Sequence, residues 1–113
     1  MKYHVEMRGR VRIIHLETPQ ATLRSGADEF RGELRSMIEA GGRYLVIDFS
    51  TVQHVDSTML EALVSAYRSL MDGAGDVVAC GLNETVATSF SLSGLDRLLR
   101  KYPDAESAVA ALS

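Results

Sequence analysis

Residues 44–63, YLVIDFSTVQHVDSTMLEAL, decide the fold of this chain. They begin with an apolar run that is broken only by Asp48, a pattern typical of a strand buried on both faces of a sheet. They end in apolar residues at helical spacing, which continue beyond residue 63. Three short polar residues, Asp56, Ser57 and Thr58, separate the two patterns. A buried strand followed by an amphipathic helix indicates one βα unit of a parallel sheet.

Upstream of this unit, the chain contains a hairpin, a loop and a helix. Residues 1–16 alternate and then become β-branched around an Arg-Gly-Arg turn, which predicts an N-terminal hairpin. Residues 17–24 contain a proline and show no periodicity, so we expect a loop. Residues 25–40 have apolar residues at helical spacing, and Ser25 with Asp28 is expected to form a capping box at the start of that helix.

Downstream, strand and helix patterns alternate again. The expected order is a helix, a buried strand, a helix, an ambiguous segment with room for a short strand, and a final helix, at residues 58–72, 77–80, 83–92, 95–102 and 104–112. The Asp-Gly-Ala-Gly sequence at residues 72–75 is expected to end the first of these helices, and Asn83 and Asp104 to cap the other two.

The element order predicts the fold class. Strands that alternate with helices imply right-handed crossovers and a parallel sheet, while the hairpin adds an antiparallel edge. The 113 residues suit one domain spanning residues 1–113. We therefore expect a single-domain α/β fold with a four- to five-stranded, mostly parallel sheet, an N-terminal hairpin and about four packed helices.

Composition restricts the class of protein. A net charge of −3 with dispersed Lys and Arg argues against a nucleic-acid partner. The single cysteine, Cys80, lies in an apolar run and is expected to behave as a small buried hydrophobe. Because the chain has neither a signal-peptide pattern nor an apolar stretch long enough to span a bilayer, we expect a cytoplasmic protein without membrane insertion.

Residues 44–63 also resemble the signature of the STAS domain, the family of sulphate transporter domains and anti-sigma factor antagonists. The family pattern is an apolar strand ending in Asp-Leu-Ser, a short loop, and Asp-Ser-Ser/Thr-Gly-Leu at the start of a helix. CGLNETVATSFSLSGLDRLL and PDAESAVAAL resemble later parts of the same family. The similarity covers essentially the whole chain in order, and implies a STAS-like fold.

The resemblance implies a phosphorylation switch at Ser57. In antagonists of this family, the serine after the aspartate is the phosphoacceptor. The kinase is an anti-sigma factor, a serine kinase of the histidine-kinase-like ATPase type, which binds the unmodified antagonist and lets the phosphorylated form go. The expected partner-binding residues are Asp56, Ser57, Thr58, Met59 and Glu61. Two of them depart from the family pattern, because Met59 and Glu61 stand where it has glycines.

The residues themselves also permit a simpler interpretation, in which Asp56, Ser57 and Thr58 only cap the helix. Thr58 with Glu61 is expected to form a capping box, which leaves Ser57 accessible just outside the helix, and Met59 is expected to lie partly exposed at the helix front. A phosphate on Ser57 gains from the helix dipole and is opposed by Asp56 and Glu61. These opposing effects predict little refolding and a large change in surface potential.

Other functions are less well supported by the sequence. A scaffold or accessory subunit of a stressosome-like or transporter complex, without a phosphoswitch, is the main alternative. No base or phosphate-binding loop accompanies Ser57, so we do not expect an enzyme or a cofactor. His4, His15 and His54 lack metal-ligand spacing. Asp48 is expected to accept a backbone N–H at the strand end, and a homo-oligomer is compatible with the sequence.

Overall fold

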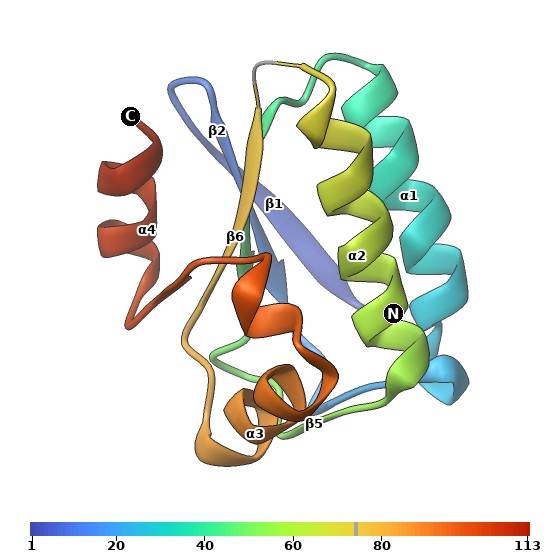
Figure 1. The fold of residues 1–113 in the computed structure, drawn as a ribbon. Helices are drawn as coiled ribbons and strands as arrows, with labels where there is room; N and C mark the ends of the chain where they lie inside the picture. Colours follow the sequence, from blue (N-terminus) through green and yellow to red (C-terminus); the bar gives the residue numbers. More distant parts are fainter. Residues whose placement is uncertain (74) are drawn as a thin grey trace.

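Five strands form one sheet in the order β1-β2-β4-β6-β7 in the computed structural model, which describes residues 1–73 and 75–113 (Figure 1). Strands β1 and β2 pair antiparallel, and every other neighbouring pair in this sheet is parallel. The strands are β1 (Tyr3–Arg8), β2 (Val11–Leu16), β4 (Tyr44–Asp48), β6 (Asp76–Cys80) and β7 (Lys101–Tyr102). The expected mostly parallel α/β sheet with an N-terminal hairpin is confirmed.

Helices cover both faces of the sheet in the described part of the chain (Figure 1). Helices α1 (Ala27–Glu39) and α2 (Ser57–Met71) lie side by side on one face, and α4 (Ala105–Leu112) covers the opposite face (Figure 1). Helix α3 (Glu84–Ser93) follows β6. The apolar run in β4 explains this layering, because Leu45 and Ile47 face the α1–α2 core and Val46 faces the α4 core, all with 0% exposure.

The segment before α1 differs from the expected loop and helix start. Residues Leu23–Ser25 form a 3₁₀ turn, η1, and α1 begins at Ala27. The Oγ of Ser25 accepts from the N–H of Thr22 at 2.8 Å and does not cap α1, so the expected Ser25–Asp28 capping box is wrong. Gly26, whose φ of +100° glycine adopts readily, separates the turn from the helix.

A small second sheet was not expected. Strand β3 (Gln20–Ala21) lies in the predicted loop and pairs in parallel with β5 (His54–Val55), just before α2. Two-residue strands are too short to show a period of two in the sequence. They form here because the segments before η1 and before α2 lie side by side in the folded chain.

The later elements match their predictions closely. The caps are confirmed: Asn83 Oδ1 accepts from Val86 N–H, and Asp104 Oδ1 accepts from Ser107 N–H, each at 2.8 Å. Helix α2 ends at Met71, and the alanine in the predicted stop at residues 72–75 lies outside the described residues. The ambiguous segment contains a 3₁₀ turn, η2 (Leu95–Arg97), followed by the short strand β7.

Candidate functional site

The loop between β4 and α2 leaves the sheet at the carboxyl end of its central strand, where open α/β sheets place their sites. Hydrogen bonds to its backbone hold this loop from two sides. The N–H groups of Gln53 and His54 donate to the carbonyl of Pro19 at 2.6 and 3.1 Å. The side-chain amide of Asn83 donates to the carbonyl of Val52 at 3.3 Å. The loop therefore positions the start of α2 firmly.

Asp56 caps α2, which corrects the expectation that Thr58 and Glu61 form a capping box. Its Oδ1 accepts from the N–H of Met59 at 3.1 Å, and its Oδ2 accepts from the N–H of Leu23 at 2.8 Å. The backbone of Asp56 is extended, with φ −119° and ψ −179°, so the cap lies two residues earlier than the expected Thr58, and the helix begins at Ser57. One carboxylate thus joins η1 to α2.

Ser57 is the first residue of α2 and is exposed. Within residues 1–73 and 75–113, its hydroxyl makes no hydrogen bond. Thr58 is half-buried, and Glu61 is exposed one turn along the helix. The structure therefore brings Asp56, Ser57, Thr58 and Glu61 together at one helix end.

Met59 does not belong to this surface, contrary to the sequence-based expectation. Its exposure is 0%, and it packs in the core between α2 and the sheet. The physical reason is the earlier helix start. Met59 shares the buried face with Ala62, Leu63 and Ala66, at the spacing of one side of a helix. A docked protein cannot contact it while the core is intact.

An apolar groove of about 290 Å³ lies directly beside Ser57. Residues of α2 form one wall, and the turn that follows α3 forms the other. The lining residues are Ser57, Leu60, Glu61, Val64, Ser93, Gly94, Leu95 and Leu98. Sequence reasoning missed this groove, although apolar residues outside any helical stripe, such as Leu98, were a signal that could have indicated it.

One leucine that lines the groove is exposed, and two exposed leucines adjoin residues of the site. Leu98 in its wall is 38% exposed, and Leu92 at the end of α3 is 84% exposed. Leu23, whose N–H bonds Asp56, is 58% exposed. Large exposed apolar side chains that cluster at one place typically mark a surface that binds another protein.

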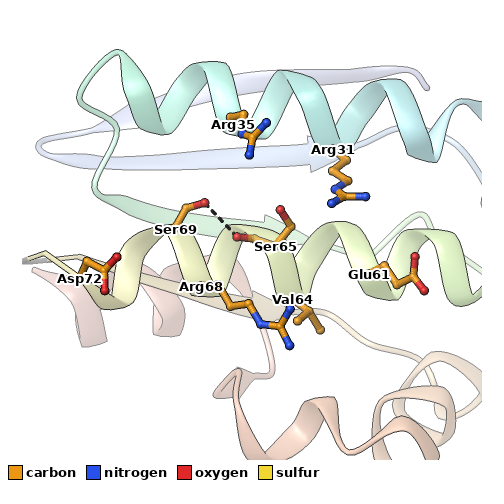
Figure 2. Close-up of a pocket in the computed structure, with 8 residues that line it drawn as sticks. All are labelled: Arg31, Arg35, Glu61, Val64, Ser65, Arg68, Ser69 and Asp72. Atoms are coloured by element: carbon orange, nitrogen blue, oxygen red, sulfur yellow. Dashed lines mark hydrogen bonds between the residues drawn. The ribbon is translucent and has the colours of Figure 1, made fainter.

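A second, polar groove of about 620 Å³ runs between the outer surfaces of α1 and α2 (Figure 2). Arg31 and Arg35 of α1 point toward α2, and Arg68 lies on α2 (Figure 2). Within the described part of the chain, none of these three arginines forms an ion pair. Glu61 and Val64 line both grooves, so the concave surface continues from Ser57 along α2.

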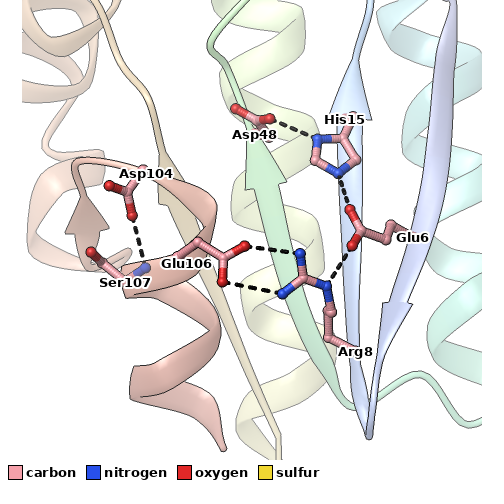
Figure 3. A network of polar contacts seen from close by, with 7 residues as sticks. All are labelled: Glu6, Arg8, His15, Asp48, Asp104, Glu106 and Ser107. Atoms are coloured by element: carbon pink, nitrogen blue, oxygen red, sulfur yellow. Dashed lines mark hydrogen bonds and ion pairs between the residues drawn. The ribbon is translucent and has the colours of Figure 1, made fainter.

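A polar network lies on the other face of the sheet (Figure 3). Nδ1 of His15 lies 2.7 Å from Asp48 Oδ2, and its Nε2 lies 2.9 Å from Glu6 Oε1. Arg8 bonds Glu106 of α4 at 2.8 Å. Asp48 Oδ1 also accepts from the N–H of Ser50 at 2.9 Å, as expected for the strand end.

The network shifts the pKa values of its members. Burial lowers the pKa of His15, but its hydrogen bonds to Glu6 and Asp48 and their charges outweigh burial, so the pKa is raised. Burial raises the pKa of Asp48, but the N–H of Ser50 and the ring of His15 outweigh burial, so the pKa is lowered. Both shifts favour a charged pair. Cys80 is fully buried, as expected, and burial with the nearby Asp48 raises its pKa to about 12.

Across the described residues, no three His, Cys, Asp or Glu side chains are grouped so that they could hold a metal ion. Within the same residues, no helix combines the length and the apolarity needed to cross a bilayer.

Comparisons with known proteins agree with this geometry. BtrV of Bordetella bronchiseptica, assigned as an anti-sigma factor antagonist, is 28% identical over 87 residues, which cover 77% of this chain and 72% of that protein.

Two solved structures share the fold. A protein of Thermotoga maritima assigned as an anti-sigma factor antagonist has a TM-score of 0.87 at 21% identity, covering 96% of this chain and 92% of that chain. The unphosphorylated anti-sigma factor antagonist SpoIIAA has a TM-score of 0.84 at 20% identity, covering 98% of this chain and 96% of that chain. The STAS domain family matches residues 3–108. The chain therefore belongs to the STAS domain family.

Proposed function

We propose that this protein is a cytoplasmic binding module that acts as an anti-sigma factor antagonist and is switched by phosphorylation of Ser57. The observation that carries the proposal is an exposed hydroxyl, free of intramolecular hydrogen bonds among the described residues, at the rim of an apolar groove. The partner is a serine kinase and anti-sigma factor of the histidine-kinase-like ATPase type. A relative by fold, SpoIIAA, is known in a phosphorylated form, which supports a switch of this kind.

In this proposal, the partner supplies the catalytic groups and this chain supplies only the nucleophile. Ser57 Oγ attacks the γ-phosphorus of ATP, its proton passes to a base of the kinase, and ADP leaves. Asp56 cannot serve readily as that base, because both of its carboxylate oxygens accept backbone N–H groups. Its role is to hold Ser57 at a fixed place at the start of α2.

The added phosphate is expected to change the surface rather than the fold. It brings about −1.5 to −2 charges. The N–H groups at the start of α2 favour it by about 0.3–1 kcal/mol. Asp56 and Glu61 oppose it, at about 3 kcal/mol for unit charges roughly 5 Å apart at an effective dielectric of about 20, and less where water screens them. No positive side chain lines the groove at Ser57 to receive it.

The switch then acts on partner affinity. We propose that apolar side chains of the partner occupy the groove formed by Leu60, Leu95 and Leu98, and that Ser57, Asp56, Thr58 and Glu61 contact its rim. A phosphate at that rim becomes a desolvated dianion in the bound state. A coupling of about 3 kcal/mol lowers affinity roughly 150-fold, which is enough for release.

Incubation with the cognate kinase and ATP, followed by intact-mass spectrometry, tests the proposal. The wild-type chain and Thr58→Ala should each gain one phosphate of about 80 Da, whereas Ser57→Ala should gain none. In binding assays with the same kinase, Ser57→Ala should keep its affinity, and Ser57→Glu should lose at least about tenfold. Phosphate on Ser57→Ala refutes the assignment of the acceptor.

A scaffold or accessory subunit without a phosphoswitch is the second candidate. It is favoured by Glu61, a carboxylate that lines the same groove as Ser57 and opposes an added phosphate. In that case the partner binds wild type and Ser57→Glu equally, and no phosphate is transferred. The variant Glu61→Gly then shows why no phosphate is transferred. It restores phosphorylation of Ser57 only if the Glu61 carboxylate prevents it.

A further inference from the structure

Strand β1 is an edge of the five-stranded sheet. It has six residues, YHVEMR, and contains no proline or glycine. Its pairing with β2 runs without a bulge from Tyr3 opposite Leu16 to Arg8 opposite Val11. Val5 and Met7 on this strand are 41% and 56% exposed. Natural proteins usually cover, bend or charge such an edge, because it can pair with another strand.

The backbone groups that point outward belong to the odd-numbered residues of β1. The carbonyl of Lys2 accepts from the N–H of Glu17 at 2.9 Å, so residue 2 bonds toward β2. Bonded and non-bonded positions alternate along an antiparallel ladder. Tyr3, Val5 and Met7 therefore direct their N–H and C=O groups away from β2, toward the free edge.

We propose that a second copy of this chain pairs with this edge, antiparallel, with Val5 opposite Val5 of the second copy. The pairing makes one continuous sheet through both copies. In this register Tyr3 lies opposite Met7, so each outward-bonding residue meets another. The hydrogen-bond donors and acceptors of the two edges match, because the residues whose backbone groups point outward lie opposite one another in the two copies.

The side chains are self-complementary in the same register. On the α1 side, where Tyr3 stacks edge-on against Phe30 at 5.2 Å, the pairs are apolar: Tyr3 with Met7, and Val5 with itself. On the other side, where Glu6 bonds His15, His4 lies opposite Glu6 of the second copy. The apolar pairs favour association, and His4 opposite Glu6 places no like charges together.

Neighbouring registers are less favourable. A shift by two residues in one direction places Glu6 opposite Glu6, and like charges directly opposite each other destabilise a sheet. A shift in the other direction places His4 opposite His4 and removes the facing Val5 residues. A shift by one residue places the odd-numbered residues of one copy opposite even-numbered residues of the other, whose N–H and C=O groups point toward β2 and cannot bond across the edge. In the proposed register, the like-charged Lys2 and Arg8 meet only at the ladder ends, where Arg8 is already paired with Glu106.

Disulfide trapping tests the register. Val5→Cys places two thiols on directly opposite residues, with Cα atoms about 5.5 Å apart, within the range of a disulfide. Met7→Cys is the matched control, because its own counterpart lies four residues along the strand, about 13 Å away. We expect Val5→Cys to form a covalent dimer at least about tenfold faster than Met7→Cys. The native Cys80 is buried and does not compete.

Analytical ultracentrifugation at protein concentrations up to about 1 mM tests the association itself, since so small an interface is weak. Wild type should dimerise, and Val5→Lys should weaken the dimer at least about tenfold, because it places two lysines opposite each other. Met71→Lys, at a 63% exposed site on α2, should not. A monomeric wild type, or equal cross-linking of the two cysteine variants, overturns the proposal. A wild type that stays monomeric while binding a strand of another protein overturns it equally.

Discussion

At the scale of single residues, Asp56 determines how α2 begins. Its two oxygens accept the N–H groups of Met59 and Leu23, so Asp56→Ala leaves both donors without this partner. We expect Asp56→Ala to lower the free energy of unfolding by about 1–2 kcal/mol in urea denaturation. Asp56→Asn should lose less, because asparagine is an equally good N-cap. Ser57→Ala, at an exposed hydroxyl, should stay within about 0.5 kcal/mol of wild type.

Met59 and Met71 lie on the same helix with opposite environments, which allows a matched comparison. Met59 is fully buried, and Met71 is 63% exposed. Met59→Ala should lower the free energy of unfolding by about 2–5 kcal/mol, since it leaves a cavity. Met71→Ala should change it by about 0.5 kcal/mol or less. Equal urea midpoints for the two variants would contradict the buried position of Met59.

The misplacement of Met59 shows what sequence reasoning lacks at this scale. The polar triplet at residues 56–58 correctly indicated a helix start, because these residue types cap helices. Any of the three could serve as the cap by composition. The choice of Asp56 depends on the N–H of Leu23, which is 33 residues away in sequence. A cap two residues earlier places Met59 in the first turn, on the same helix face as Leu63 and Ala66.

At the scale of elements, Asn83 joins the start of α3 to the loop before α2. Its Oδ1 caps α3, and its Nδ2 donates to the carbonyls of Val52 and Gln53 at 3.3 and 3.4 Å. Asn83→Ser keeps a capping oxygen but lacks the amide that reaches the loop. Hydrogen exchange should therefore rise in residues 49–56 for Asn83→Ser and Asn83→Ala, and in the first turn of α3 for Asn83→Ala alone.

If hydrogen exchange in residues 49–56 is unchanged in Asn83→Ser, the only structural role of Asn83 is to cap α3. The capping function was predictable, because asparagine before a helical pattern is a local signal. The contact with Val52 was not, since it joins two loops 31 residues apart. Strands β3 and β5 were missed for the same reason.

At the scale of the whole molecule, the network around His15 links the hairpin, the central strand and the region of α4 (Figure 3). The raised pKa of His15 stabilises the fold fully below the ordinary value of 6.5, and this stabilisation is lost as pH rises through the raised value. The lowered pKa of Asp48 stabilises the fold above the ordinary value of 3.8, and this contribution is lost as pH falls through the lowered value.

We therefore expect the urea midpoint of the wild type to fall as pH rises above 6.5 and through the raised pKa of His15. His15→Gln should remove this dependence, because glutamine does not titrate. His54→Gln is the control, since His54 is exposed and outside the network, and it should keep the dependence. A wild-type midpoint that is flat over this range would contradict a charged His15.

The sequence by itself determined the order of strands and helices, the apolar central strand and the presence of a polar helix start at residues 56–58. These features depend on the spacing of apolar residues and on cap chemistry, which act over a few positions. Only the tertiary structure decided which of the polar residues caps α2, that Met59 is buried, and that Leu60, Leu95 and Leu98 form a groove beside Ser57. Those outcomes depend on contacts between segments far apart in the chain, which the local spacing of residues does not specify.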